Sequence, residues 1–299
     1  MSKILFTIRG KPRTLGMGDI AMLACPVYFR GRSLGYDEVY LEWPNIVTGP
    51  KYKKVRCPKK TIIPVNFIKR SDIRKKDFDE ILDLRDKHVL FNFYPGIDLD
   101  TEGKKTKSLY GIYNFNNLYL YSTGIKPVFK VDKDKLEKPY IIIHHRNYKT
   151  AQFRNSKEET TKIVLDLLRD TLGDKYEIWK MGEPTSFDEE FDRVTTINYN
   201  DVNEYFKTIN NSSMVLGNGQ SGITATGNYF DIPVVRLDVN FESKISRNLL
   251  SVYHWSALCG VGYTCYDWAG PEKNRVYYVN KFGELELENL EKFVIKWLL

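Results

Sequence analysis

The hydrophobic positions of the chain fall into short apolar runs separated by longer stretches with apolar residues at helical spacing. In the N-terminal half, residues 3–9 form an apolar run, residues 20–36 carry the helical spacing, and residues 38–43 form a second run. Strand, helix and strand in this order are the repeating unit of a parallel sheet. A further strand is predicted at 88–95, before an aromatic stretch with partial alternation at 107–124.

The same pattern returns in the C-terminal half, where strands and helices alternate more regularly. The helix predicted at 156–173 has Ser156 and Glu159 at the spacing of a capping box, and Gly173 at its end. Regular alternation of strand and helix predicts a doubly wound parallel sheet. The predicted strands lie at 139–146, 176–182, 212–219 and 232–238, and the predicted helices at 156–173, 201–211, 221–230 and 284–299.

A chain of 299 residues is long enough for two domains, each with its own hydrophobic core. The polar segment at 126–138 is the candidate linker, since Pro127 lies near its start and Pro139 directly follows it. We predict an N-terminal domain at 1–130, a C-terminal domain at 139–280 and a terminal helix within 281–299, for which packing against the N-terminal domain is one arrangement. The predicted fold class is α/β, with two Rossmann-like, doubly wound domains that face a cleft.

Composition limits the class of protein. With 42% hydrophobic and 14% aromatic residues, the chain is expected to be folded over most of its length. It has no apolar run near the ~20 residues that cross a bilayer, and its first residues lack the features of a secretion signal, so a cytoplasmic location is expected. The four cysteines have no C-x-x-C spacing and no histidine nearby, which predicts buried free thiols rather than a metal site.

The positive charge of the chain is local. The formal net charge is +7, but residues 51–76 contain eleven Lys or Arg and a single acid, so this basic segment carries +10 and the rest of the chain −3. Two interpretations suit it: a solvated surface, or a site for a phosphate-rich or acidic partner. For the second, the candidate binding residues are Lys53, Lys54, Arg56, Lys59 and Lys60.

Residues 217–235 combine glycines and hydroxyl side chains between two apolar runs. The segment follows a predicted strand, and ligands of open α/β sheets bind where such strands end and the next helix begins. Gly219 and Gly222 allow close backbone approach, and Ser221 and Thr224 lie beside the unpaired N–H groups of the first helical turn. Both a diphosphate site and an ordinary capped helix after a tight turn agree with this pattern.

A second glycine-rich turn precedes the first predicted helix. Gly16 and Gly18 frame this turn, and Asp19 stands where the helix begins. An Asp in this position caps the helix in many proteins. A carboxylate on a cleft-facing loop can also take a proton from a hydroxyl group, so the sequence leaves both roles open.

A dense group of basic residues follows the predicted strand at 139–146. Arg and Lys at such a place can neutralise a diphosphate leaving group. The two adjacent histidines are expected to alternate, one packed and the other facing the cleft, and the absence of a third ligand argues against a metal site. The members of the group are His144, His145, Arg146, Lys149 and Arg154.

The next predicted strand ends in a turn that contains Gly182 and Glu183. Glu183 is placed to accept hydrogen bonds from a ribose or a base. A plain surface turn is the alternative, and both interpretations stay open.

Taken in order, these segments resemble the GT-B glycosyltransferases related to the lipopolysaccharide heptosyltransferases. The resemblance rests on the GMGD turn, the HHRN and RNS segments, the WKMGEP turn and the GNGQSGIT loop. It implies a catalytic aspartate at Asp19. The donor-binding residues that it implies, with the cations and turn residues above, are Arg146, Lys149, Arg154, Gly182, Glu183, Gln220, Ser221, Gly222 and Thr224. The loop departs from the family motif at three places, with Gln220 for the usual Asp, Ser221 for Thr and Ala225 for His.

The function implied by this resemblance is inverting, metal-independent transfer of a sugar from a nucleotide-diphosphate sugar to a hydroxyl of an anionic acceptor. The expected acceptor is a phosphorylated glycan or lipopolysaccharide-type core, with peripheral membrane contact as an option. A hydroxylated base of DNA is the alternative acceptor, with aromatic residues at 110–121 to stack it. A non-catalytic nucleic-acid-binding protein and a nucleotide-sugar epimerase are competing functions, and no cofactor is expected beyond the donor.

Overall fold

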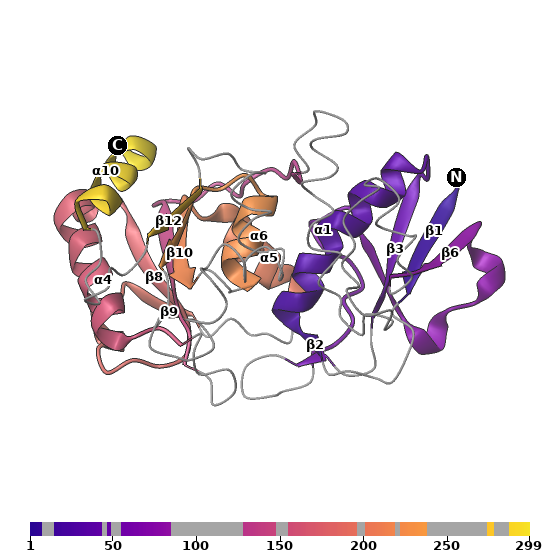
Figure 1. The fold of residues 1–299 in the computed structure, drawn as a ribbon, viewed down its shortest axis with the longest axis horizontal. Coiled ribbons are helices and arrows are strands. Elements are labelled where there is room, and N and C mark those ends of the chain that lie inside the picture. The colour runs from indigo at the N-terminus through magenta and orange to yellow at the C-terminus, as the bar shows by residue number, and fades with distance from the viewer. Residues whose placement is uncertain are drawn as a thin grey trace, which may run out of the picture.

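The computed structural model of the protein describes residues 1–7, 15–43, 47–48, 55–84, 128–147, 155–195, 201–218, 222–237, 274–277 and 287–299. Figure 1 shows two α/β halves side by side, with the N-terminus in one and the C-terminus in the other. All strand pairs in both sheets are parallel among the described residues. The predicted α/β class is confirmed.

The N-terminal half is a four-stranded sheet in the order β5-β3-β1-β6, with helix α1 packed on it. The predicted strand, helix and strand within residues 3–43 are confirmed, and Gly35 follows α1 in the left-handed region at φ +89°. Strands β2 and β4 pair with each other outside the main sheet. The elements are β1 (Lys3–Thr7), β2 (Leu15–Gly16), α1 (Met17–Ser33), β3 (Glu38–Trp43), β4 (Val47–Thr48), β5 (Asn66–Lys69), the 3₁₀ turns η2 (Arg70–Asp72) and η3 (Lys75–Asp77), and β6 (Glu80–Asp83).

The C-terminal half is a six-stranded sheet in the order β12-β11-β10-β7-β8-β9. Its first strand, β7, lies inside the sheet and later strands add on both sides of it, so the doubly wound topology is confirmed. The elements are β7 (Tyr140–His145), α4 (Glu158–Leu172), η6 (Gly173–Lys175), β8 (Glu177–Gly182), η7 (Asp188–Glu190), β9 (Arg193–Thr195), α5 (Val202–Asn211), β10 (Met214–Asn218), α6 (Gly222–Tyr229), β11 (Val234–Leu237), β12 (Asn274–Tyr277) and α10 (Leu287–Leu298). The segments predicted at 88–95 and 107–124 lie outside the described residues.

The start of helix α4 differs from the prediction. The helix begins at Glu158 with Lys157 at the N-cap, whose side chain makes no capping hydrogen bond. Ser156 is bonded to the end of β7 instead: its N–H donates to the Arg146 carbonyl at 2.8 Å, and its Oγ accepts from the Arg146 N–H at 3.2 Å. The predicted capping box is therefore wrong, because the serine closes the loop before the helix. Gly173 ends α4 as predicted, at φ +53°.

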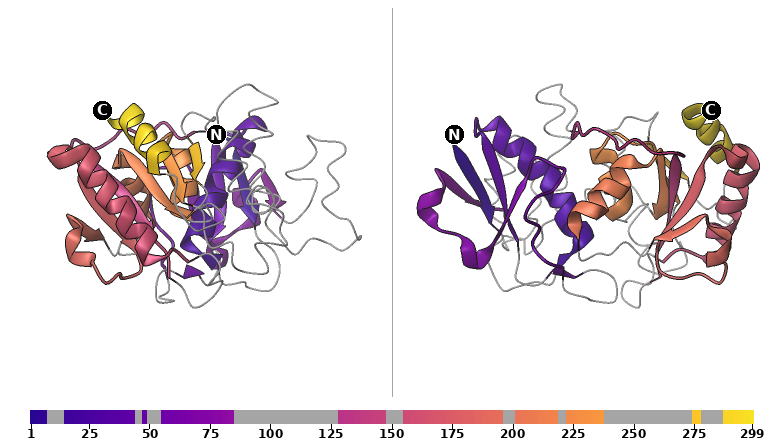
Figure 2. Two further views of the ribbon diagram at one scale, coloured as in Figure 1. Left: turned by 60° about the vertical axis from the view of Figure 1, so that its left-hand side comes forward. Right: turned by 180° about the vertical axis from the view of Figure 1, so that it is seen from behind.

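Helix α10 packs on the C-terminal half, beside α4, as the views in Figure 2 also show. Its buried residues Leu290, Phe293 and Val294 join the cluster that α4 forms with the sheet. The Tyr176 hydroxyl donates to the Leu298 carbonyl at 2.8 Å and fixes the end of the helix. Packing of the terminal helix against the N-terminal domain is thus wrong, because α4 supplies the apolar surface that this amphipathic helix needs.

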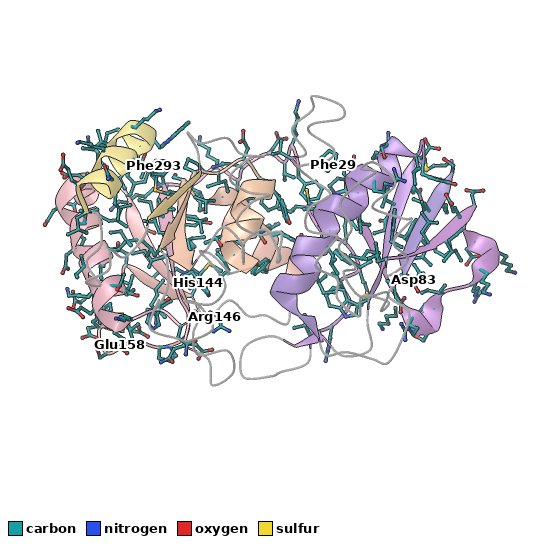
Figure 3. All side chains as sticks on the ribbon, viewed as in Figure 1. Phe29, Asp83, His144, Arg146, Glu158 and Phe293 are labelled. Carbon is teal, nitrogen blue, oxygen red and sulfur yellow. The ribbon has the colours of Figure 1, made fainter. Side chains whose placement is uncertain are left out.

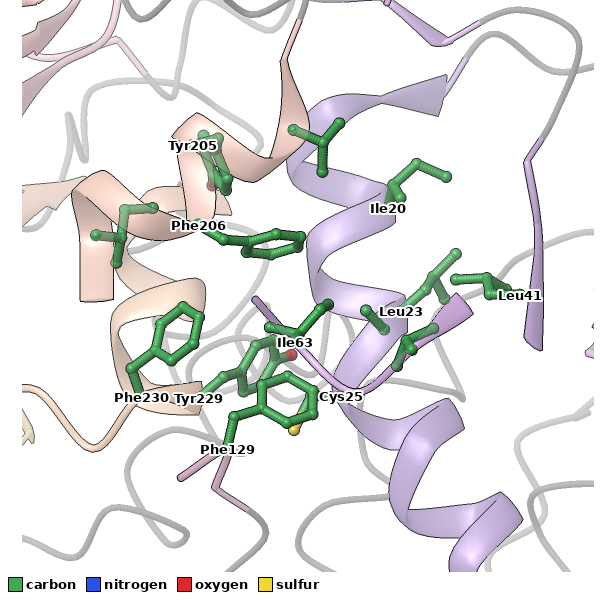
Figure 4. Packing of buried hydrophobic residues seen from close by; sticks show 14 of the residues in the cluster. Ile20, Leu23, Cys25, Leu41, Ile63, Phe129, Tyr205, Phe206, Tyr229 and Phe230 are labelled. Carbon is green, nitrogen blue, oxygen red and sulfur yellow. The ribbon is translucent and has the colours of Figure 1, made fainter. Parts of the chain in front are cut away.

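One hydrophobic core runs across the boundary between the two halves. Helix α1 packs against α6, and its Leu23 belongs to the same buried cluster as Phe206 of α5 and Phe230, which directly follows α6 (Figure 4). The linker joins this core, since the Phe129 ring centroid lies 6.0 Å from that of Phe29 in α1 and 6.1 Å from that of Phe230. The second cluster, on the face of the C-terminal sheet that α4 covers, belongs to one half alone. We expected a separate core for each domain. Only the core between α4 and the C-terminal sheet belongs to a single half, because the other core is shared by both halves.

The described residues also bear on the expected state of the cysteines and on membrane-spanning helices. Neither Cys25 nor Cys57 forms a disulfide bond with a described residue; Cys25 is buried, whereas Cys57 is only half-buried, and burial raises the pKa of the Cys57 thiol to about 11. Of the helices in the described stretches, none is both long and apolar enough to cross a membrane.

Replacing Phe206 by Ala is expected to destabilise both halves together. The side chain is 1% exposed in the shared core, so its loss should lower the free energy of unfolding by about 3–5 kcal/mol. Calorimetry should show one unfolding transition, shifted to lower temperature in the variant. The control Ile163→Ala, at a 36% exposed position on α4, should shift it little. Two transitions, with only one moved by the Phe206 change, would contradict the shared core.

Candidate functional site

The carboxyl ends of β7, β8 and β10 lie next to one another at one edge of the C-terminal sheet. In the parallel register, His144 pairs with Gly217 and His145 with Gly182. Figure 3 shows His144 and Arg146 at this edge, toward the end of the molecule where α1 begins. Ligands of doubly wound sheets bind at such an edge, and the predicted donor-binding residues follow these same strands.

Two glycines allow the strand ends to approach closely. Gly182 has φ +111°, and a Cβ there would lie 2.0 Å from the carbonyl oxygen of His145. At Gly217 a Cβ would lie 2.8 Å from the Cβ of His144. No side chain can be accommodated at Gly182 without moving the backbone. This predicted donor-site residue therefore has a definite structural role, because it permits the turn after β8.

Both histidines are buried, so the prediction that one faces the cleft is wrong. His144 is 6% exposed and His145 0% exposed, because helices cover both faces of the sheet. Burial lowers the pKa of His144 to about 3, assisted by the charge of Arg146, and the pKa of His145 to about 4, assisted by Lys180. Both rings are neutral at pH 7, so they do not contribute to the positive charge of this edge.

His145 Nδ1 has a hydrogen-bond partner. It lies 2.9 Å from the Thr161 hydroxyl, which also lies 3.2 Å from the Lys157 carbonyl, and the tautomer of the ring decides whether Nδ1 donates or accepts. In the described part of the chain, His145 Nε2 and His144 Nδ1 are buried without a hydrogen-bond partner. Each such atom lowers the stability of the fold by about 1–3 kcal/mol. This edge of the sheet is therefore not optimised for stability alone.

Arg146 is the one predicted donor-binding cation that lies among the described residues. Its Nη1 donates to Asn155 Oδ1 at 2.7 Å, and Asn155 Nδ2 donates to Asn147 Oδ1 at 3.3 Å. These contacts join the two ends of the loop after β7 and hold the half-buried guanidinium at the strand end. The other two predicted cations, Lys149 and Arg154, lie outside the described residues.

Glu183 lies in a turn whose backbone is held from two sides. Its N–H donates to the His145 carbonyl at 2.9 Å, and its own carbonyl accepts from Lys180 Nζ at 2.8 Å. The Glu183 side chain is half-buried, and its carboxylate makes no hydrogen bond or ion pair with any described residue. The turn thus fixes the main chain and leaves an acceptor group available for a ligand.

Lys180 is a site residue that the sequence analysis did not identify. It is 0% exposed, and its Nζ pairs with Asp188, which also accepts from Thr185 N–H at 2.9 Å and Oγ1 at 2.5 Å. Although burial raises the pKa of Asp188, the hydrogen bonds from Lys180 and Thr185 outweigh it and lower that pKa below its ordinary value. Lys180 stands between the apolar residues Trp179 and Met181 of β8, which indicates that a partner is needed but does not identify Asp188 as that partner.

The loop after β10 is described only in part. Helix α6 begins at Gly222 as predicted, while Gln220 and Ser221 lie outside the described residues. Thr224 has no exposed surface, so its hydroxyl is buried. Its part in donor binding stays a prediction.

Asp19 lies in the first turn of α1, which begins two residues earlier at Met17. This placement differs from that of an N-cap residue, which precedes the helix. A carboxylate in the first turn is stabilised by the helix dipole. Catalysis by Asp19 stays a prediction.

The predicted acceptor residues belong to the segment that leads from β4 to β5 along the boundary between the halves. The Ile62 N–H donates to Asn203 Oδ1 at 2.8 Å, which ties this segment to α5 of the other half. Buried Val55 and Ile63 anchor it in the shared core. The exposed side chains are Arg56, Lys59 and Lys60, while Lys53 and Lys54 lie outside the described residues.

The remaining charge of the basic segment lies at and beyond the edge strand β5. There Arg70 pairs with Glu42, which is 2% exposed, and Lys75 and Lys76 are exposed in η3. Within the described residues 55–76, the charge of the basic segment is therefore divided between two stretches. As for metal ligands, the described residues contain no group of three His, Cys, Asp or Glu side chains that could hold an ion.

Comparison with solved structures identifies the fold. The protein resembles E. coli heptosyltransferase WaaC with ADP, at a TM-score of 0.53 and 13% identity, over 98% of this chain and 99% of that one. It resembles E. coli ADP-heptose lps heptosyltransferase II at a TM-score of 0.53 and 12% identity, over 99% of both chains. No protein-family model and no curated sequence matches the chain. The predicted resemblance is confirmed at the level of the fold, which is that of the GT-B glycosyltransferases.

The buried histidines predict a loss of stability in mild acid. Because the folded pKa values lie below the ordinary 6.5, the unfolded chain takes up protons first as the pH falls below 6.5. Stability should fall by up to about 1.4 kcal/mol per pH unit for each histidine. His145→Asn, which keeps a hydrogen-bonding group near Thr161, should remove one such contribution from denaturant unfolding measured between pH 6.5 and 5. Thr161→Val should lower stability without changing the slope; an unchanged slope in His145→Asn would contradict the burial.

Proposed function

We propose that the protein is a glycosyltransferase that moves a sugar from a nucleotide-diphosphate sugar to a hydroxyl group of an anionic acceptor, with inversion and without a metal ion. The observation that carries the proposal is the placement of Arg146, Glu183 and the start of α6 at neighbouring strand ends of a GT-B fold. A nucleotide diphosphate carries anionic phosphates and a hydroxylated ribose. This edge offers a cation and a helix N-terminus for the phosphates and an unpaired carboxylate for the ribose.

On the donor side, the bond that breaks joins the anomeric carbon to the diphosphate. The negative charge that develops on the diphosphate is met by the Arg146 guanidinium and by the N–H groups at the start of α6. Positive charge here comes from arginine rather than histidine, since both histidines are neutral at pH 7. The Lys180 and Asp188 pair keeps the Glu183 turn in place while the nucleotide binds.

On the acceptor side, Asp19 takes the proton of the attacking hydroxyl, whose oxygen bonds to the anomeric carbon from the side opposite the diphosphate. Displacement from that side inverts the anomeric configuration. In Figure 1 the start of α1 lies beside β2 on the lower side of the molecule, and in Figure 3 Arg146, which follows β7, also lies on the lower side. This common direction supports a reaction between a donor on one half and an acceptor on the other.

Replacing Asp19 by Asn tests the proposed base. Nucleotides should raise the melting temperature of the wild type and of the variant equally, because Asp19 is not assigned to the donor. ADP, which the solved E. coli heptosyltransferase WaaC contains, is the first nucleotide to test, followed by a panel of nucleotide sugars. Transfer should fall by about 100-fold or more in the variant, measured as nucleotide release on adding acceptor. The exposed control Asp72→Asn should retain it.

No stabilisation by any nucleotide or nucleotide sugar would contradict the glycosyltransferase proposal as a whole. Stabilisation with full turnover in Asp19→Asn would contradict only the assignment of the base. Conversion of a sugar nucleotide to its epimer without an acceptor would point to the epimerase class instead.

Replacing Arg56 by Glu tests the anionic acceptor. The acceptor KM should rise several-fold, and its dependence on salt should become weaker, because one cation that attracts the acceptor is lost. Arg74→Glu is the matched control, since it makes the same charge change at another exposed arginine of the basic segment. Equal acceptor KM values for both variants and the wild type would overturn the assignment.

A further inference from the structure

A cavity of about 750 Å³ lies where the end of α1, the amino ends of β3 and β5, and the linker come together. Its size is in the range of sites that take small organic molecules. Its lining includes four aromatic side chains, Tyr28, Phe29, Phe67 and Phe129. Three of these rings are only half-buried, so the cavity offers them to a ligand as an apolar wall.

The charge around this cavity is positive and unpaired. Lys59, Lys60 and Lys130 line it, are exposed, and make no hydrogen bond or ion pair with any described residue. The two acids that also line it are engaged elsewhere. Asp37 accepts from the N–H and the hydroxyl of Ser2 at 2.7 and 3.1 Å, and Glu38 accepts from the Tyr40 hydroxyl at 2.7 Å and lies 3.6 Å from Lys3 Nζ.

The cavity is remote from the edge where transfer is proposed. Tyr28 and Phe29 lie nine and ten residues after Asp19 on the same helix, which places them about 14 Å further along its axis. Figure 3 shows Phe29 on the upper side of the molecule, and His144 and Arg146 lower down in the C-terminal half. The sequence pattern assigns Lys59 and Lys60 to the acceptor, but their position on this rim separates them from the start of α1.

We propose that this cavity is a second ligand site, which binds one small amphipathic anion. The apolar body of the ligand packs on the aromatic wall, and its phosphate, sulfonate or carboxylate group is held by the three lysines. Aromatic rings beside lysines favour a ligand that is both apolar and anionic. A neutral apolar ligand would make no ion pair with the lysines, and an inorganic ion would leave the rings exposed to water.

The site lies against the linker, and this gives the ligand contact with both halves. Phe129 packs on Phe29 of α1 and on Phe230, which directly follows α6, and its N–H donates to the Tyr229 carbonyl at 2.7 Å. A ligand that packs on Phe129 therefore adds contacts at the boundary between the halves. Binding should accordingly raise the melting temperature of the whole protein.

The fluorescent probe 1-anilinonaphthalene-8-sulfonate, an aromatic anion, tests the site directly and without reference to transferase activity. The folded wild type should bind one molecule with increased fluorescence. Lys59→Glu/Lys60→Glu should weaken binding about tenfold or more, while the matched control Lys75→Glu/Lys76→Glu, at exposed positions outside the cavity, should stay within about twofold of the wild type. Equal weakening by both double variants would overturn the proposal, because it would reveal only general charge attraction.

A steric variant makes the test independent of charge. Asn66 is exposed and lines the cavity, so Asn66→Trp should fill part of it and weaken probe binding while the melting temperature of the free protein stays unchanged. Probe binding equal to that of the wild type in this variant would also overturn the site.

Competition identifies the body of the ligand. Displacement of the probe by 1-naphthyl phosphate indicates a planar aromatic ligand, and displacement by dihexanoyl phosphatidate indicates an acyl chain with a phosphate head. Displacement by neither compound contradicts an amphipathic phosphate site. Because every measurement uses probe binding, the outcome is separate from the nucleotide tests of the proposed transfer.

Discussion

The packing of α1 against α5 and α6 is the interaction on which the arrangement of the molecule depends. Each sheet needs a covering layer on its faces, and the two halves meet by sharing one such layer. Leu23, Phe206 and Phe230 are buried in it, and the hydrophobic free energy of this contact opposes separation of the halves. This contact sets how the two sheets are oriented relative to each other.

This packing also limits how the halves can move. A hinge that opens widely would expose the aromatic side chains of the shared core to water, at a cost of about 25 cal/mol for each Å² of apolar surface. Small sliding motions of packed helices keep these contacts. Movement of one half relative to the other is therefore more compatible with shear along α1 than with free rotation about the linker.

Local sequence patterns were sufficient for most of the secondary structure and for the topology. The apolar runs at 3–9 and 139–146 and the amphipathic pattern at 156–173 predict β1, β7 and α4, because periodicity reports which faces are buried. Strands β5 and β6 were missed, since they are short, partly exposed and embedded among charged residues. Features that depend on contacts between distant segments could not be predicted in this way. The burial of His144 and His145 requires knowing that helices cover both faces of β7, and the buried pair of Lys180 and Asp188 requires the turn that joins them.

The close approach of β7 to its neighbours has a consequence for recognising related proteins. Side chains that bind or react can be exchanged between related proteins as substrates change. The main chain around Gly182 has no such freedom, because even a methyl group there would overlap a carbonyl oxygen of the adjacent strand. An alignment of distant homologues is therefore better anchored on this glycine than on the chemical groups of the loop before α6.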